Sequence, residues 1–213
     1  MNEKTKKIVG VGIFTAIVVV LQLLGSFIKF GTFSVSLVLI PIIVGAALYD
    51  FGAGAWLGFV FGVTVLLSGD ATPFLAVNPV GTVVTVLLKG TLAGLAAGAV
   101  FKALEKKSGF AATICAGITA PVVNTGVFLL GCLVFFMPTI QEWATAAGVE
   151  SAGKFMIVGL VGLNFVFELV INLVLSSVIV KLISLGKKEV GSAKTTKTVT
   201  IEVDGDINKI DVD

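Results

Sequence analysis

Apolar stretches of membrane-spanning length dominate this sequence. A helix needs about 20 mostly apolar residues to cross the hydrocarbon core of a bilayer. Candidate segments of this kind lie at residues 8–28, 34–49, 53–67, 79–101, 110–136 and 155–183. The chain is 56% hydrophobic and only 13% charged over its 213 residues, more apolar surface than a soluble domain of this length buries. The sequence therefore predicts an all-α membrane protein, a compact bundle of six transmembrane helices.

All 15 basic residues of this chain are lysines, and their distribution predicts the orientation in the membrane. Cytoplasmic loops of membrane proteins carry an excess of basic residues. A cytoplasmic N-terminus leaves only Lys29 and Lys154 outside. It places nine lysines inside: Lys4, Lys6, Lys7, Lys102, Lys106, Lys107, Lys181, Lys187 and Lys188. We therefore expect both termini to be cytoplasmic.

The composition changes after Lys188. The stretch that follows is polar, and apolar residues alternate on either side of Asp204-Gly205, a dipeptide typical of a β-hairpin turn. We expect a transmembrane domain at residues 1–188 and a cytoplasmic tail at 189–213, either flexible or folded as a small hairpin.

Several classes of function are excluded by residues that the chain lacks. It has no histidine, and it has no glycine-rich loop ending in Lys-Ser/Thr, so it carries neither a histidine-based catalytic or metal site nor a P-loop ATPase. Cys115 and Cys132 fall in one predicted helix, about 25 Å apart, and cannot form an intrachain disulfide. We expect no enzymatic activity, no cofactor and no metal, so any ATP must be hydrolysed by another subunit.

Small residues recur at four-residue steps in three of the predicted helices. Such rows allow helices to approach closely in a membrane. Two rows favour packing inside the bundle: Gly54, Gly58 and Gly62, then Gly90, Gly94 and Gly98. Gly12 and Ala16 form a shorter row near the cytoplasmic end of the first helix, where an exposed small-residue face could instead dock a partner.

Few polar side chains fall in the middle of the predicted helices. Lys89 lies about 15 Å from the outer start of its helix, and Asn124 lies midway along the next one. Asn164, Glu168 and Asn172 are four residues apart and so share one helix face. Lipid contact would be costly for all five, so we expect them to face the bundle interior.

These polar residues leave three interpretations open. Lys89 and Glu168 could form a buried ion pair whose hydrogen bonds the asparagines complete, although desolvation makes such a pair weak evidence of stabilisation. They could instead line a pocket in which lysine meets a substrate carboxylate. Proton transfer through Glu168 is a third possibility, for which one acid and no histidine make a poor relay.

Three stretches of the chain resemble a known family. They are SLVLIPIIVGAALYDFGAGAWLGFVFGVTVLL, then NPVGTVVTVLLKGTLAGLAAG, then APVVNTGVFLLG. Together they are similar to the substrate-binding S components of energy-coupling factor (ECF) vitamin transporters, over about residues 8–185. The resemblance implies a multi-pass protein of the bacterial plasma membrane that binds a water-soluble vitamin or precursor from outside. It also implies a partner module of one transmembrane coupling protein and two ATPase subunits.

The resemblance further implies site residues. Family pockets are built from the fourth to sixth helices, which corresponds to Lys89, Asn124, Asn164 and Glu168, with Asn78 as a further candidate. The segment SFIKFGTFS would close the pocket. The small-residue pair that meets the coupling protein corresponds to Gly12 and Ala16, so glycine replaces one alanine of the family pattern.

The sequence leaves alternatives open for both the substrate and the transport mechanism. Lys89 slightly favours a carboxylate such as pantothenate or folate, whereas Glu168 suits a cation such as thiamin. Aromatic partners for a ring are available in Phe27, Phe30, Phe33 and Trp56. A stand-alone solute carrier driven by an ion gradient is the main functional alternative, with Glu168 or Asp70 as its coupling site.

Overall fold

The computed structural model describes residues 3–27, 29–30, 33–34 and 37–186. Nearly all of them are helical. The labelled helices are α1 (Glu3–Phe27), α2 (Leu39–Leu48), α3 (Phe51–Ser68), α4 (Thr72–Val77), α5 (Pro79–Leu104), α6 (Gly109–Phe135), α7 (Met137–Ala146), α8 (Ala152–Lys154), the π-helix η1 (Phe155–Gly162) and α9 (Leu163–Val174). A helix at Ser176–Gly186 follows. Two short antiparallel strands, β1 (Lys29–Phe30) and β2 (Phe33–Ser34), pair within the segment after α1.

Five helical segments of the described residues are long and apolar enough to cross a membrane. They are Lys4–Phe27, Phe51–Ser68, Pro79–Leu104, Gly109–Phe135 and Ala152–Val174. The all-helical membrane architecture is thereby confirmed. The second predicted segment appears as α2, which has ten residues and extends about 15 Å, half of the hydrocarbon thickness. The count of six transmembrane helices therefore stays a prediction, and the predicted tail at 189–213 lies outside the described residues.

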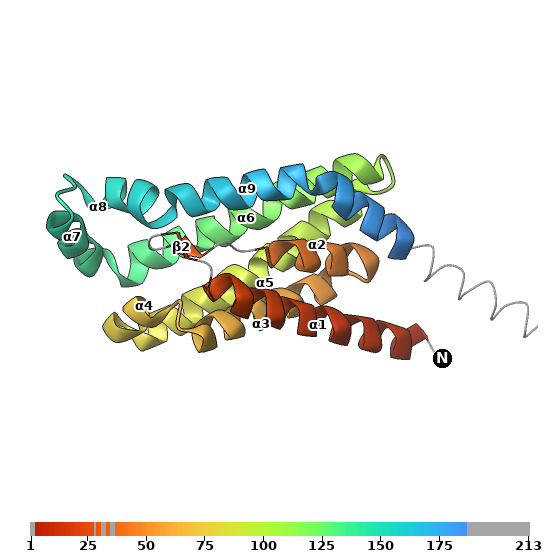
Figure 1. Ribbon diagram of the computed structural model, residues 1–213, viewed down its shortest axis with the longest axis horizontal. Helices are drawn as coiled ribbons and strands as arrows, with labels where there is room; N and C mark the ends of the chain where they lie inside the picture. The colour runs from red at the N-terminus through yellow and green to blue at the C-terminus, as the bar shows by residue number, and fades with distance from the viewer. Residues whose placement is uncertain (1–2, 28, 31–32, 35–36, 187–213) are drawn as a thin grey trace, which may run out of the picture.

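The long helices form a layered bundle (Figure 1). α1 and α3 lie along one side, α6 and α9 along the other, and α5 runs between them. The short helices α4, α7 and α8 cluster at the end of the bundle opposite the N-terminus. α2 is buried against α3 and α5, which explains how so short and apolar a helix is accommodated.

The contact between α3 and α5 is made by the two predicted glycine rows. A Cβ atom at Gly58 would lie 2.0 Å from the Gly90 carbonyl oxygen, and one at Gly94 would lie 2.0 Å from that of Gly54. The two backbones therefore touch, and glycine is required because any side chain would push the helices apart. This close contact fixes the position of α5, the helix that carries Lys89.

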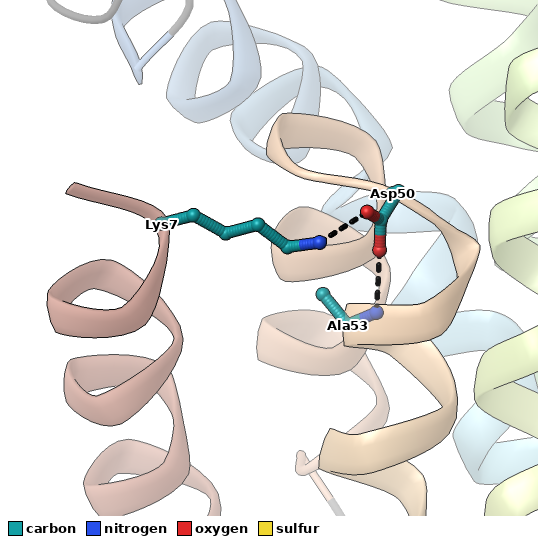
Figure 2. Close-up of polar contacts among 3 residues, drawn as sticks. All are labelled: Lys7, Asp50 and Ala53. Carbon is teal, nitrogen blue, oxygen red and sulfur yellow. Dashed lines mark hydrogen bonds and ion pairs between the residues drawn. The ribbon is translucent and has the colours of Figure 1, made fainter. Parts of the chain in front are cut away.

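α1 is the least buried of the five long helices and is held by polar contacts at its N-terminal end (Figure 2). The Lys7 ammonium donates to the Asp50 carboxylate, which also accepts from the Ala53 N–H at 2.8 Å and so caps the start of α3. Further along α1, the Trp56 indole donates to the Thr15 hydroxyl at 3.1 Å. These contacts join α1 to the start of α3.

Removing the Asp50 carboxylate should destabilise the fold. Asp50→Ala loses the helix cap and is expected to cost about 0.5–2 kcal/mol in free energy of unfolding. Asp50→Asn keeps a capping oxygen for Ala53 and loses only the ion pair with Lys7, so its cost should be smaller. Thermal unfolding of the purified protein in detergent measures both, and equal stability of wild type and Asp50→Ala would contradict the cap.

The ion pair also predicts a pH dependence. Partial burial alone raises the pKa of the Asp50 carboxyl, but hydrogen bonds from Lys7 and the Ala53 N–H, with the charge of Lys7, hold it below the usual 3.8. A lowered folded-state pKa stabilises the fold above the unfolded-state pKa, and this stabilisation is lost as the pH falls through the folded-state value. The stability difference between wild type and Asp50→Asn should therefore be constant near neutral pH and shrink below about pH 4. A difference that does not shrink contradicts this assignment.

Candidate functional site

A cavity of about 170 Å³ lies inside the bundle, and its lining includes Phe74 of α4 and Phe136, the residue before α7. A single water needs roughly 10–15 Å³ by the same kind of measure, so the space suits a small organic molecule. Its lining comes from α1, α3, α4, α5, α6, η1 and α9. The polar lining residues are Gln22, Asp70, Thr82, Thr85, Lys89, Asn124, Thr125 and Glu168. The cavity thus brings together three of the five predicted binding residues: Lys89, Asn124 and Glu168.

Lys89 projects from α5 into the cavity between two aromatic rings. Its ammonium lies 5.7 Å from the ring centre of Phe61 on α3 and 5.5 Å from that of Phe128 on α6. The face of an aromatic ring attracts a cation, but it does not neutralise the cation's charge as an anion would. Within the described part of the chain, no acidic side chain lies within 4.0 Å of this ammonium. Glu168 and Asp70 act on it only at longer range.

Asn124 and Thr85 present polar atoms at a similar depth. Asn124 is 5% exposed, on α6 one turn after the buried Pro121. Thr85 is 4% exposed and lies one turn before Lys89 on α5. Neither the Asn124 Oδ1 nor the Thr85 Oγ1 atom has a hydrogen-bond partner among the described residues. Buried polar atoms are normally hydrogen-bonded, so these two are candidate contacts for a polar ligand.

The acid of the site comes from the sixth predicted segment. Glu168 lies on α9, is 3% exposed and lines the cavity. The eight-residue π-helix η1 precedes it, and Leu160 and Val161 of η1 line the cavity too. π-helical turns occur frequently at functional sites. Periodicity did not predict this wider turn, because the apolar sequence of η1 suits either kind of helix.

The other polar candidates have different positions. Asn78 caps the start of α5, where its side chain accepts from the Gly81 N–H at 2.9 Å, and it is not a lining residue of the cavity. Asn164 lies in α9, but its side chain is outside the described set. Asn172 is buried one turn beyond Glu168 and does not line the cavity either. Binding by Asn78 and Asn164 stays a prediction.

Aromatic residues form the apolar wall of the cavity, and the lining aromatics among the described residues are Phe61, Phe74, Phe128, Phe136 and Phe165, none of which was proposed from sequence. Phe74 of α4 packs edge-on against Phe128, Phe136 and Trp143, with ring centres 5.1–5.5 Å apart. Trp56 lies on the outer surface against α1. Phe27 is exposed, and the side chains of Phe30 and Phe33 are not described. The predicted lid, SFIKFGTFS, likewise lies partly outside the described residues.

A second polar group of the cavity, around Asp70, was missed as a binding candidate. The Asp70 carboxylate accepts from Gln22 Nε2 at 2.9 Å, from the Ser26 hydroxyl at 2.6 Å and from the Ser68 hydroxyl at 3.1 Å. These bonds tie α1 to the end of α3, and both Gln22 and Asp70 line the cavity. The signal in the sequence was Gln22 itself, a single amide within the apolar run VVVLQLL.

The predicted partner surface lies on the outward-facing side of α1. Gly12 and Ala16 are both exposed on α1, and a Cβ atom added at Gly12 would meet nothing within 4 Å. This face is not used for packing by the described residues, unlike the glycine rows of α3 and α5. Its role in partner binding stays a prediction.

Comparison with known proteins identifies the family. The model for "ECF transporter, substrate-specific component" matches residues 6–180. The solved structure of ThiT from Listeria monocytogenes has the same fold, with a TM-score of 0.65 and 19% sequence identity, covering 87% of this chain and 99% of the ThiT chain. No curated protein matches the sequence. The chain therefore belongs to the family of substrate-specific components of ECF transporters.

Proposed function

We propose that the protein is a high-affinity binding protein for a water-soluble vitamin or related small solute, which it takes from outside the cell and delivers to an ATP-driven ECF coupling module. The observation that carries this proposal is the cavity in which Lys89, Asn124 and Glu168 converge from three helices. Ionisable groups inside a membrane bundle mark substrate pathways, and polar groups in a mostly apolar pocket fix a ligand's orientation. Asn78 and Asn164 are secondary candidates.

We propose six membrane segments, with both termini cytoplasmic, in a bacterial plasma membrane. The placement of lysine supports this orientation. The described lysines of the proposed inner side include Lys7 on α1 and Lys102 on α5, whereas the cavity lies toward the other end, where Phe74 and Phe136 line it. In the proposed orientation the cavity is nearer the outer surface, which supports capture of an external solute.

Coupling to a separate module is favoured over a stand-alone carrier by the family membership. The chain also has no P-loop of its own. Reconstitution in proteoliposomes separates the two mechanisms. Uptake of the solute should require the transmembrane coupling protein, both ATPase subunits and ATP. Uptake by the protein alone, driven by an ion gradient, would establish a stand-alone carrier and contradict the S-component mechanism.

The exposed Gly12–Ala16 face is the proposed docking surface for the coupling protein. A Cβ atom at Gly12 would meet nothing within 4 Å, so Gly12→Trp should leave folding and solute binding intact while ATP-dependent uptake falls at least tenfold. Val134→Trp on α6, also an exposed position, is the matched control and should keep uptake. Normal uptake by Gly12→Trp in the assembled transporter would contradict the docking assignment.

A further inference from the structure

One ionisable group of the cavity, the Lys89 side chain, bears on which solute the cavity takes. Lys89 presents an ammonium that makes no hydrogen bond or ion pair within the described part of the chain. The faces of Phe61 and Phe128 flank it, and they offer its N–H donors no conventional hydrogen-bond acceptor. A cation in a water-poor cavity is costly without a hydrogen-bonded anion.

The two acids that line the cavity do not supply that anion by direct contact. Asp70 lies at the junction of α3 and α4, where its carboxylate already accepts from Gln22, Ser26 and Ser68. Glu168 projects from α9 and stays beyond 4.0 Å from the Lys89 ammonium. Among the described residues no acid lies within hydrogen-bond distance of Lys89, which leaves that position open to an anionic group of the ligand.

Acceptor atoms on the neighbouring helices define the rest of the ligand. Asn124 Oδ1 accepts no hydrogen bond from the described residues, and Glu168 adds carboxylate oxygens from α9, the helix that packs against α6. A second ligand carboxylate there would be repelled, whereas a hydroxyl, amide or protonated amine would donate to these oxygens. The Thr85 hydroxyl, one turn from Lys89, can donate to the ligand's anionic end.

Resting on the proposed function, we propose that the solute is a small organic acid that carries a carboxylate for Lys89 and Thr85 and a hydroxyl or N–H donor for Asn124 and Glu168. Its apolar part lies against the rings of Phe74, Phe128 and Phe136. A cationic group in place of that carboxylate is disfavoured, because it would lie beside the Lys89 ammonium and be repelled by it.

Matched pairs of compounds test this inference by thermal unfolding of the purified full-length protein. The pairs are nicotinate with nicotinamide, biotin with biotinamide, and pantothenate with panthenol, each an acid and an uncharged analogue; thiamin serves as the cation. One acid should stabilise the protein in proportion to RT ln(1 + [L]/Kd), with its uncharged analogue binding at least tenfold more weakly. This comparison uses the wild-type protein and needs no variant.

Variants then assign the preference to Lys89. Lys89→Met should weaken binding of the acid by about 10- to 100-fold and remove its advantage over the uncharged analogue. Lys89→Arg should keep the advantage, and Lys154→Met, which removes an exposed lysine outside the cavity, should bind as wild type does.

The possible results distinguish the organic-acid inference from the proposed solute-binding function on which it rests. Equal stabilisation by acid and uncharged analogue, or stabilisation by thiamin alone, overturns the organic-acid assignment while leaving a solute-binding protein. A preference for the acid that survives in Lys89→Met overturns the role of Lys89. No stabilisation by any of the seven compounds, in protein that unfolds cooperatively, contradicts the vitamin-binding function, and the inference falls with it.

Discussion

Gly58→Ala is expected to destabilise the protein by about 1–3 kcal/mol or more, the usual cost of overpacking a tight interior. The added methyl group would lie 2.0 Å from the Gly90 carbonyl oxygen and 2.7 Å from its carbonyl carbon. These are backbone atoms of α5 and cannot turn aside as a flexible side chain could. The helices must therefore separate, which weakens their packing along the whole contact.

The same change at an open position is the control. Gly126→Ala also lies in a long helix, α6, but its new methyl group would meet nothing within 4 Å. It should keep or slightly raise stability, because alanine has the higher helix propensity. For a chain of this size, 1 kcal/mol corresponds to about 2–4 °C in Tm, so thermal unfolding in detergent resolves the difference.

A larger side chain sharpens the comparison. Gly58→Leu should prevent α3 and α5 from packing and leave little monodisperse protein, whereas Gly126→Leu should still fold. Gly58→Ala with the Tm of wild type would mean that the helices do not touch as described. Because α5 carries Lys89, partly folded Gly58 variants should also bind solute more weakly than Gly126→Ala does.

Asp70→Ala is the second change with a large expected effect. It removes the acceptor of three hydrogen bonds and leaves the amide of Gln22, which is 4% exposed, without the carboxylate. A buried polar group that loses its partner costs about 1–3 kcal/mol. We expect the free energy of unfolding to fall by about that amount and α1 to become more accessible to proteolysis.

Asp70→Asn is the matched control, because its amide oxygen still accepts from Gln22 and Ser26. It should lose less stability than Asp70→Ala. Since Gln22 and Asp70 both line the cavity, Asp70→Ala should also lower solute affinity, whereas Asp50→Ala, which loosens α1 at its other end, should not. Equal stability of wild type and Asp70→Ala would contradict the role of Asp70 in holding α1.

Much of this fold was predictable from the sequence, because a helix that crosses lipid must be apolar over a fixed length. Apolar length identified the helices, and glycine spacing predicted close packing inside the bundle, which the structure shows between α3 and α5 through Gly54, Gly58 and Gly90. The second segment forms a helix of only ten residues, α2, and its crossing of the membrane stays a prediction. Its apolar residues follow from burial by α3 and α5, which hydropathy does not distinguish from burial by lipid.

The candidate site was only partly predictable. Lys89, Asn124 and Glu168 were recognisable because charged and amide groups are rare in the middle of an apolar helix. Asn78 has a structural role that the sequence analysis did not consider, because an asparagine before a proline also caps a helix, as it does here. Gln22 was missed because α1 lies outside the helices expected to form the pocket, and its contact with Asp70 spans 48 residues of sequence.

The charge balance of the cavity depends on distances that spacing along a helix does not give. Sequence alone left open a direct Lys89–Glu168 pair, since both lie at similar depth. In the structure the ammonium lies between Phe61 and Phe128 instead. Those rings come from α3 and α6, so only the packing of three helices against one another places them around Lys89.

The central claim is that a solute binds in the cavity between α5, α6 and α9. The most direct test is thermal unfolding of the wild type and of Thr125→Trp, whose indole would occupy the cavity from α6, against a panel of water-soluble vitamins and precursors. We predict that one compound raises the Tm of the wild type in a concentration-dependent way and leaves that of Thr125→Trp unchanged. The same shift in both proteins, or no shift in either although both unfold cooperatively, would contradict the claim.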